Sequence, residues 1–182
     1  MKKLVFLLLA ISLLLVSCGN DNNTDSSLQG TNTEAPREEE NSYPPASNFN
    51  MKDIHGRELK LSDLASKPIV LNFWASWCPP CKAELPDFEE AYRKYGNDIN
   101  FVMLSVDETI EEAMDIVSQN SYTFPVYHDY SGAASYYYNV ESIPRTYFIS
   151  PTGYIIASHE SMISANQLEA CIQELIKKGQ AH

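Results

Sequence analysis

A buried strand that leads directly into a pair of cysteines constrains the fold of this chain more than any other feature. Residues 68–74 are apolar except for Asn72, which indicates a strand in the middle of a sheet. Cys78 and Cys81 follow at once, and the apolar side chains after them recur at three- and four-residue steps. The sequence therefore predicts a strand, a tight turn and a helix over about residues 78–95, with both cysteines at the helix start.

The predicted helix start favours a reactive thiol at Cys78. Unpaired backbone N–H groups and the positive end of the helix dipole stabilise a thiolate at this position. Cys81 lies about one turn further along, close enough to form a disulfide with Cys78. Pro79 and Pro80 occupy first-turn positions, where proline is tolerated because those N–H groups have no partner within the helix. These residues predict a site of dithiol–disulfide exchange.

A zinc site and an inert structural disulfide are the alternative interpretations of the cysteine pair. Zinc needs two further ligands at suitable spacing. Cys18 and Cys171 have no such partners nearby, and no histidine lies within a few residues of the pair. We therefore expect no metal at this site, while an inert disulfide stays open beside a redox-active one.

Length and charge limit the possible architectures and partners. A chain of 182 residues can form one domain with its own core and additional segments, and four cysteines are too few for a disulfide-built scaffold. The formal net charge of −11 disfavours nucleic acid and anionic lipid surfaces as binding partners. We expect no nucleic-acid function.

The first residues have the pattern of a lipoprotein leader. Two lysines precede the apolar run at residues 4–16, as in a secretory signal, and this run is shorter than the roughly twenty residues that span a membrane. The sequence Leu-Val-Ser-Cys-Gly at residues 15–19 resembles the bacterial lipobox, in which cleavage precedes the cysteine and its thiol is acylated. We expect residues 1–17 to be a signal peptide and Cys18 to anchor the protein in the cell membrane, on its extracytoplasmic face.

The segment after Cys18 has the composition of a tether. Residues 19–48 are rich in Asn, Ser, Thr, Asp, Glu and Pro, and they cannot bury enough apolar surface to offset the entropy lost on ordering. A flexible coil of this length has an end-to-end distance of roughly 30 Å. We therefore predict a lipidated, flexible tether over residues 18–46 and a folded domain over residues 47–182.

The sequence of the folded domain predicts strands that alternate with helices. Further strands are expected at residues 49–52, 59–61, 99–106, 124–127, 146–150 and 154–159, and further helical segments at residues 62–64, 109–120, 133–138 and from 164 onward. This order predicts an α/β sandwich with a central mixed sheet flanked by helices. Cys171 falls on the apolar face of the last helix, which predicts a buried and unreactive thiol.

Taken together, these residues resemble the thioredoxin superfamily and, within it, the membrane-anchored TlpA/ResA-like thiol-disulfide oxidoreductases. The resemblance covers about residues 47–178 and also includes the leader. Its motifs are the Trp-Cys-Pro-Pro-Cys stretch at residues 70–81, Glu-Leu-Pro at 84–86, Phe-Pro-Val at 124–126, Ser-Ile-Pro-Arg-Thr-Tyr-Phe-Ile at 142–149 and Pro-Thr-Gly at 151–153. It implies a thioredoxin-like fold with an N-terminal β-hairpin extension.

The resemblance also implies roles for individual residues. Cys78 would attack a partner disulfide and Cys81 would resolve the mixed disulfide. Pro144 matches the family's cis-proline, which faces the cysteine pair and holds the partner's backbone. Glu84 matches an active-site carboxylate of the ResA-like group, and its place three residues after Cys81 puts both on one helical face.

Asn72 departs from the pattern of cytosolic thioredoxins, which carry a buried Asp at this place. We therefore expect Glu84 to accept the proton of the resolving cysteine, with an ordinary solvated helix residue as the alternative. Trp77 and Ile143 are expected to help Pro144 to dock the partner.

The implied function is disulfide reduction outside the cytoplasm by a monomer without a cofactor. The partner would be a disulfide-bearing extracytoplasmic protein, such as apocytochrome c, a methionine sulfoxide reductase or a sporulation protein, and a membrane thiol carrier would supply electrons. The direction of exchange depends on the reduction potential.

A peroxiredoxin-type peroxidase and a copper carrier are the rival interpretations. The residues before Cys78 lack the Pro-x-x-x-Thr-x-x-Cys setting of a peroxidatic cysteine. A copper carrier would need His128 or His159 to fold towards the cysteine pair.

Overall fold

The computed structural model describes residues 42–179. The predicted signal peptide, the lipidation site at Cys18 and most of the predicted tether lie outside the described residues. Within residues 42–179, none of the helices combines the length and the apolar character that a membrane span requires.

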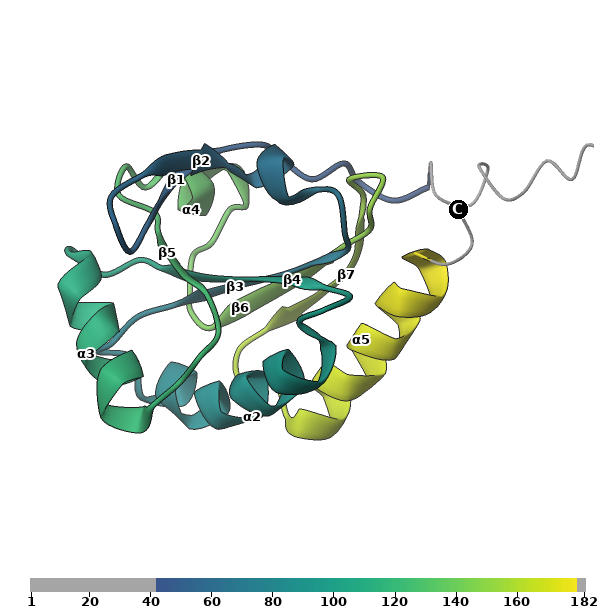
Figure 1. Cartoon of the computed structure of the whole chain (residues 1–182). Coiled ribbons are helices and arrows are strands. Elements are labelled where there is room, and N and C mark those ends of the chain that lie inside the picture. Colours follow the sequence, from purple (N-terminus) through teal and green to yellow (C-terminus); the bar gives the residue numbers. More distant parts are fainter. Residues whose placement is uncertain (1–41, 180–182) are drawn as a thin grey trace, which may run out of the picture. The chain divides into compact units, whose positions relative to one another are not determined.

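A seven-stranded mixed sheet forms the centre of the domain, in the order β2-β1-β5-β4-β3-β6-β7 (Figure 1). The strands are β1 (Asn50–Asp53), β2 (Glu58–Lys60), β3 (Ile69–Trp74), β4 (Asn100–Ser105), β5 (Val126–His128), β6 (Arg145–Ile149) and β7 (Ile155–Glu160). Strand β3 pairs in parallel with β4 and antiparallel with β6. The strand before the cysteine pair therefore lies in the interior of the sheet, where both of its faces are covered.

Helices cover one face of this sheet and a mixed layer covers the other (Figure 1). The helices are η1 (Leu61–Leu64, a 3-10 helix), α2 (Pro79–Tyr95), α3 (Ile110–Asn120), α4 (Ala133–Tyr137) and α5 (Ala165–Gly179). Side chains of α2, α3 and α5 share one hydrophobic cluster, and side chains around α4, η1 and the β1–β2 hairpin share the other. The predicted sandwich and its N-terminal hairpin are confirmed.

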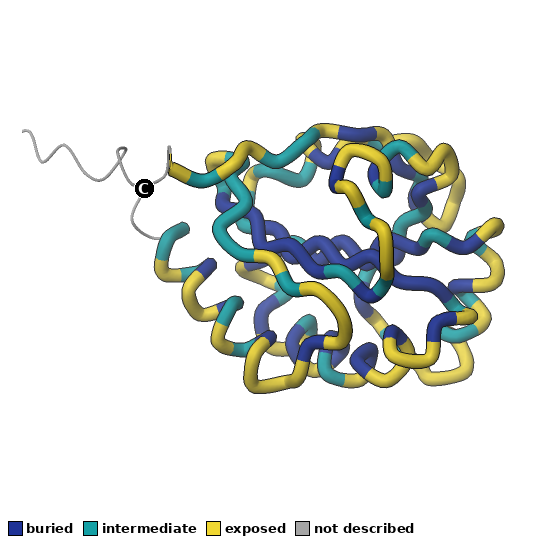
Figure 2. The backbone as a smooth tube through the Cα atoms, turned by 180° about the vertical axis from the view of Figure 1, so that it is seen from behind, coloured by how far each residue is buried: buried dark blue, intermediate teal, exposed yellow. Residues whose placement is uncertain are grey.

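The alternation of side chains along β3 divides these two cores. Val70 and Trp74 belong to the cluster under α2, whereas Leu71 and Phe73 belong to the opposite cluster. Because strand side chains alternate between faces, Asn72 points to the same side as Val70 and Trp74. Figure 2 shows the central strands as the most continuously buried part of the backbone. A polar side chain is thus placed in the core directly beneath α2.

Helix α2 begins and ends as its sequence requires. Cys78 is the N-cap residue, with extended backbone angles, and two prolines fill the first turn. The helix continues through Pro86 to Tyr95 and is capped by Gly96. Gly96 has right-handed helical angles, but a Cβ at this position would lie 2.7 Å from the carbonyl oxygen of Tyr92. Glycine is therefore required here by a close backbone approach.

Two smaller expectations were tested by the described residues. The last helix, expected from residue 164 onward, is preceded by Ser164, whose backbone N–H and hydroxyl both donate to the side-chain oxygen of Gln167. Cys171 is a free thiol, and the prediction that it is buried was wrong in degree, because its side chain is only partly buried. It lies at the edge of the α5 apolar face, where the neighbouring Ile172 takes the fully buried position.

Candidate active site

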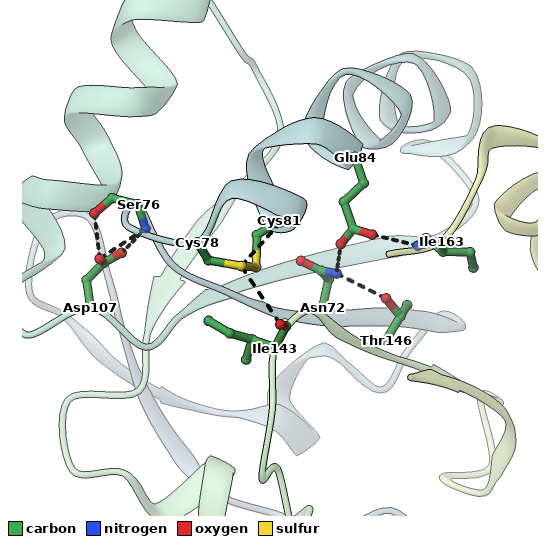
Figure 3. The surroundings of a disulfide bond; sticks show 9 residues. All are labelled: Asn72, Ser76, Cys78, Cys81, Glu84, Asp107, Ile143, Thr146 and Ile163. Atoms are coloured by element: carbon green, nitrogen blue, oxygen red, sulfur yellow. Dashed lines mark hydrogen bonds between the residues drawn. A yellow bond between two sulfur atoms is a disulfide. The ribbon is translucent and has the colours of Figure 1, made fainter. Parts of the chain in front are cut away.

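The cysteine pair lies at the junction of β3 and α2 and is joined as a disulfide (Figure 3). The Cα atoms of Cys78 and Cys81 are 5.3 Å apart. The backbone N–H of Cys81 donates a hydrogen bond to the sulfur of Cys78, at 3.2 Å. Cys78 is 3% exposed and Cys81 is fully buried. The sulfur of Cys78 therefore receives the first free N–H of the helix, while Cys81 lies behind it.

The loop before β6 brings Ile143 and Pro144 to the cysteine pair. Strand β6 pairs with β3 in a register that sets Thr146 opposite Asn72, so the residues before β6 reach the end of β3 where the cysteines follow. The Ile143–Pro144 peptide bond is cis. The carbonyl oxygen of Ile143 lies 3.9 Å from the sulfur of Cys78 (Figure 3). The sheet thus brings together two segments that are 65 residues apart in the chain.

Glu84 is a core residue and not a solvated helix residue, because only 1% of it is exposed. Its Oε1 accepts a hydrogen bond from the amide nitrogen of Asn72 at 2.9 Å, and its Oε2 accepts one from the backbone N–H of Ile163 at 2.8 Å. Burial raises the pKa of Glu84 to about 7, and these two hydrogen bonds only partly oppose that rise. A carboxyl group with such a pKa can take up and release a proton near neutral pH.

Asn72 connects this carboxylate to the sheet. Its Nδ2 also donates to the hydroxyl of Thr146 on β6, at 3.0 Å. Asn72 and Thr146 are both fully buried. The residue that replaces the acid of cytosolic thioredoxins is thus hydrogen-bonded to the nearby acid Glu84.

A second buried carboxylate, which was not among the site residues expected from the sequence, holds the loop before Cys78. Asp107 lies just beyond the end of β4 and accepts the backbone N–H of Ser76 at 3.0 Å and its hydroxyl at 2.7 Å. The hydroxyl of Ser105 also donates to Asp107, at 2.9 Å. A signal was present in the sequence, since Asp107 follows a buried strand and the ends of neighbouring parallel strands meet at one edge of a sheet.

A groove beside the disulfide is open to solvent. Trp77 is 63% exposed and forms part of its wall. The groove has a volume of about 350 Å³ and is lined by Trp77, Val106, Ser135, Val140, Glu141, Ser142 and Ile143. It therefore combines apolar side chains with one carboxylate and reaches the cysteine pair through Ile143.

The two histidines of the copper interpretation contact backbone oxygens. A ring nitrogen of His128 lies 3.0 Å from the carbonyl oxygen of Asp107, and one of His159 lies 3.3 Å from that of Met162. Over residues 42–179, no group of three or more His, Cys, Asp or Glu side chains is arranged to hold a metal ion.

Comparison with known proteins places this site in a family. A sequence model of the AhpC/TSA family matches residues 44–158. Thiol-disulfide oxidoreductase ResA of Oceanobacillus iheyensis is 34% identical over 125 residues, which cover 68% of this chain and 65% of that protein. The ResA protein of Bacillus thuringiensis is 32% identical over 173 residues, which cover 94% of this chain and 95% of that protein.

A solved structure supports the same assignment. The crystal structure of StoA from Bacillus subtilis matches with a TM-score of 0.61 and 28% identity, and the match covers 71% of this chain and 99% of that one. The resemblance predicted from the sequence motifs is confirmed. The chain belongs to the AhpC/TSA family and is a relative of the ResA and StoA thiol-disulfide oxidoreductases, with their thioredoxin-like fold.

Proposed function

We propose that this protein is an extracytoplasmic thiol-disulfide oxidoreductase that reduces disulfides of partner proteins. The observation that carries the proposal is the disulfide at the start of α2, which lies beside the cis-proline loop and close to an accessible groove. The names of the ResA relatives support the same reaction class. No cofactor is needed, because the two thiols supply both electrons.

The first step is attack by the reduced Cys78 thiolate on one sulfur of the partner's disulfide. A bond forms between the sulfur of Cys78 and the attacked sulfur of the partner, the partner's S–S bond breaks, and its second sulfur leaves as a thiolate that takes up a proton. The N–H of Cys81 and the start of the helix favour the thiolate of Cys78. The result is a mixed disulfide between Cys78 and the partner.

The second step is resolution by Cys81. Its thiol gives its proton to Glu84, and the resulting thiolate attacks the sulfur of Cys78. The mixed disulfide breaks, the partner's remaining sulfur leaves as a thiolate, and the Cys78–Cys81 disulfide forms. Two electrons have then passed to the partner, and the raised pKa of Glu84, about 7, suits the proton transfer.

The partner would dock across the groove beside the disulfide. Pro144 and Ile143 would hold its backbone, and Trp77 would cover the residues next to its cysteine. The exposure of Trp77 and the short distance between Ile143 and Cys78 support these roles.

Trapping the mixed disulfide tests the proposed reaction. A Cys81→Ser variant should stall after the first step and retain its partner through Cys78, which mass spectrometry would identify. Cys78→Ser should trap nothing, and Cys171→Ser is the matched control that should exchange normally. Consumption of peroxide by the wild-type protein without a partner protein would instead support the peroxidase interpretation.

The membrane attachment is a separate part of the proposal. Cys18 would carry the lipid, the protein would act as a monomer at the extracytoplasmic face, and a membrane thiol carrier would return electrons to it. The lipobox-like residues before Cys18 support this location, since two or three acyl chains give stable attachment whereas one is marginal. A Cys18→Ala variant should stay unprocessed or leave the membrane fraction. A wild-type protein with an unmodified N-terminus in the soluble fraction would contradict the anchor.

A further inference from the structure

One oxygen atom in the core of the active site has no hydrogen-bond partner. It is Oδ1 of Asn72, a residue with no exposed surface, and among the described residues nothing donates to it. Figure 3 shows this oxygen on the side of the carboxamide that faces the disulfide, while Nδ2 faces Glu84 and Thr146. An unpaired buried acceptor is unfavourable, so its position on the side of the carboxamide that faces the disulfide requires an explanation.

The oxidation state of the cysteines explains why Oδ1 of Asn72 has no partner. A disulfide has no S–H group, so neither sulfur can donate to Asn72 in the oxidised protein. Reduction creates a thiol on each cysteine. The sulfur of Cys78 lies against the carbonyl oxygen of Ile143, so the fully buried Cys81 is the thiol placed to donate inward. We infer that Asn72 is a positioning residue for the resolving step, whose carboxamide binds the Cys81 thiol when the disulfide is reduced and couples it to Glu84.

The contacts of Glu84 determine which of its oxygens takes part. Its Oε2 is occupied by the backbone N–H of Ile163, a group that can only donate. A proton on Oε2 would oppose that hydrogen bond, so Glu84 protonates on Oε1, the oxygen that faces Asn72. Asp87, on the same helix, is a charged neighbour that further favours the protonated form of Glu84.

The carboxamide of Asn72 can form hydrogen bonds to Cys81 and to Glu84 both before and after the proton transfer. Before transfer, its Oδ1 accepts from the Cys81 thiol and its Nδ2 donates to the Glu84 carboxylate. After transfer, a half-turn of the amide lets Nδ2 donate to the Cys81 thiolate and Oδ1 accept from the Glu84 carboxyl. Thr146 can follow, because a hydroxyl group both donates and accepts. Every polar contact of Asn72 can therefore reverse together.

This step transfers one proton from Cys81 to Glu84. The S–H bond of Cys81 breaks and an O–H bond forms at Oε1 of Glu84, while Asn72 is chemically unchanged. This inference rests on the proposed exchange reaction, and it adds that Asn72 sets both the ease of resolution and the stability of the reduced state.

Replacing Asn72 by alanine tests the inference through equilibrium and rate. The variant removes the unpaired acceptor of the oxidised protein and the thiol acceptor of the reduced one. Its equilibrium with glutathione should therefore shift about tenfold towards the disulfide, which is about 30 mV for two electrons. Attack by Cys78 on a small aromatic disulfide should proceed as in the wild type. Release of the second thiolate should be about tenfold slower, with its pH midpoint moved upward because Glu84 loses a hydrogen bond that lowers its pKa.

Thr146→Val is the matched control, since it alters the same buried network but leaves both the Oδ1 atom and the Asn72–Glu84 bond. Its equilibrium with glutathione should shift by less than that of Asn72→Ala, because the acceptor Oδ1 for the Cys81 thiol is still present. Equal shifts in the two variants, or no shift in Asn72→Ala, would overturn the inference.

Nuclear magnetic resonance of the wild-type protein gives a test that needs no variant to fold. The side-chain amide signals of Asn72 should move on reduction and, in the reduced protein, should titrate together with the carboxyl carbon of Glu84. Amide signals that ignore both redox state and pH would overturn the inference while leaving the exchange reaction intact. A wild-type protein that does not exchange with glutathione at all would instead overturn the proposed function.

Discussion

Two buried glutamates on helix α2 differ in their chemistry although they share one helix. Glu84 is 1% exposed and Glu89 is 7% exposed, so burial opposes the charged form of each. The pKa of Glu84 is accordingly raised to about 7, whereas the pKa of Glu89 is lowered in spite of its burial. The difference lies in the groups that each carboxylate meets.

Glu89 receives enough donors to outweigh its burial. It accepts the backbone N–H and the hydroxyl of Thr123, both at 2.7 Å, the backbone N–H of Phe124 at 3.2 Å, and the guanidinium of Arg93 at 2.7 Å. Glu84 has two neutral donors and no cation among its hydrogen-bond partners in the described part of the chain. Glu89 therefore stays charged and fastens the segment before β5 to α2, while Glu84 can exchange a proton.

The largest expected effect is on the rate of exchange. Glu84→Gln keeps the shape of the side chain but removes its titration, so it should fold, form the Cys78–Cys81 disulfide and lose roughly ten- to a thousandfold in exchange rate. The loss should appear in release of the reduced partner more than in the first attack, which stopped-flow kinetics can separate. Wild-type rates across neutral pH in this variant would mean that the Cys81 proton goes to water.

The second effect is the pH dependence of stability. Because folding raises the pKa of Glu84 from 4.5 to about 7, the folded protein holds a proton that the unfolded chain has already released between these pH values. This group therefore lowers stability as pH rises from 4.5 to 7, by about 3 kcal/mol at most. Denaturant unfolding of the oxidised protein at pH 5 and pH 8 should show this loss in the wild type and not in Glu84→Gln. An equal pH dependence in both proteins would contradict the assignment.

Glu89→Gln should lower stability without slowing exchange, whereas Glu84→Gln slows exchange. Its carboxylate carries structural hydrogen bonds, so the variant should lose about 1–3 kcal/mol of stability at pH 7 and exchange disulfides at the wild-type rate. The lowered pKa of Glu89 means that its contribution is fully present above the ordinary value of 4.5 and is lost as pH falls through the folded value. A slower resolving step in this variant would remove the distinction between the two glutamates.

The smallest effect is expected for the ion pair beside Glu89. The side chain of Arg93 is 65% exposed, and exposed pairs contribute at most about 1 kcal/mol. Arg93→Gln should therefore lower the free energy of unfolding by less than Glu89→Gln does, as measured by chemical denaturation. A loss as large as that of Glu89→Gln would show that the cation, and not the donors of Thr123 and Phe124, keeps Glu89 charged.

Local sequence patterns were sufficient for the elements of this fold. The apolar run before Cys78 predicted β3 because a strand covered on both faces has few polar residues. The helical segment expected at residues 109–120 is present as α3, and it begins with a capping box of Thr109 and Glu112, whose reciprocal hydrogen bonds join residues three apart in the chain. Such signals survive in the sequence because they depend on neighbours along the chain.

The hydrogen-bond partners and the pKa shift of each buried polar group could not be predicted from such local patterns. Asp107 and Ser76 are 31 residues apart, and Glu84 and Ile163 are 79 apart, so their contacts exist only after the sheet has formed. Glu84 and Glu89 lie on the same predicted helix, and nothing in their spacing distinguishes a raised pKa from a lowered one.

The sequence by itself determined the cysteine pair, its place at a helix start and the family to which the chain belongs, because these depend on short motifs. The tertiary structure decided that Asn72 lies between Glu84 and Thr146 and that Ile143 reaches the sulfur of Cys78. The physical reason is that a pKa depends on desolvation and on the donors within hydrogen-bond distance, and both are set by strands and helices that meet only in the folded protein.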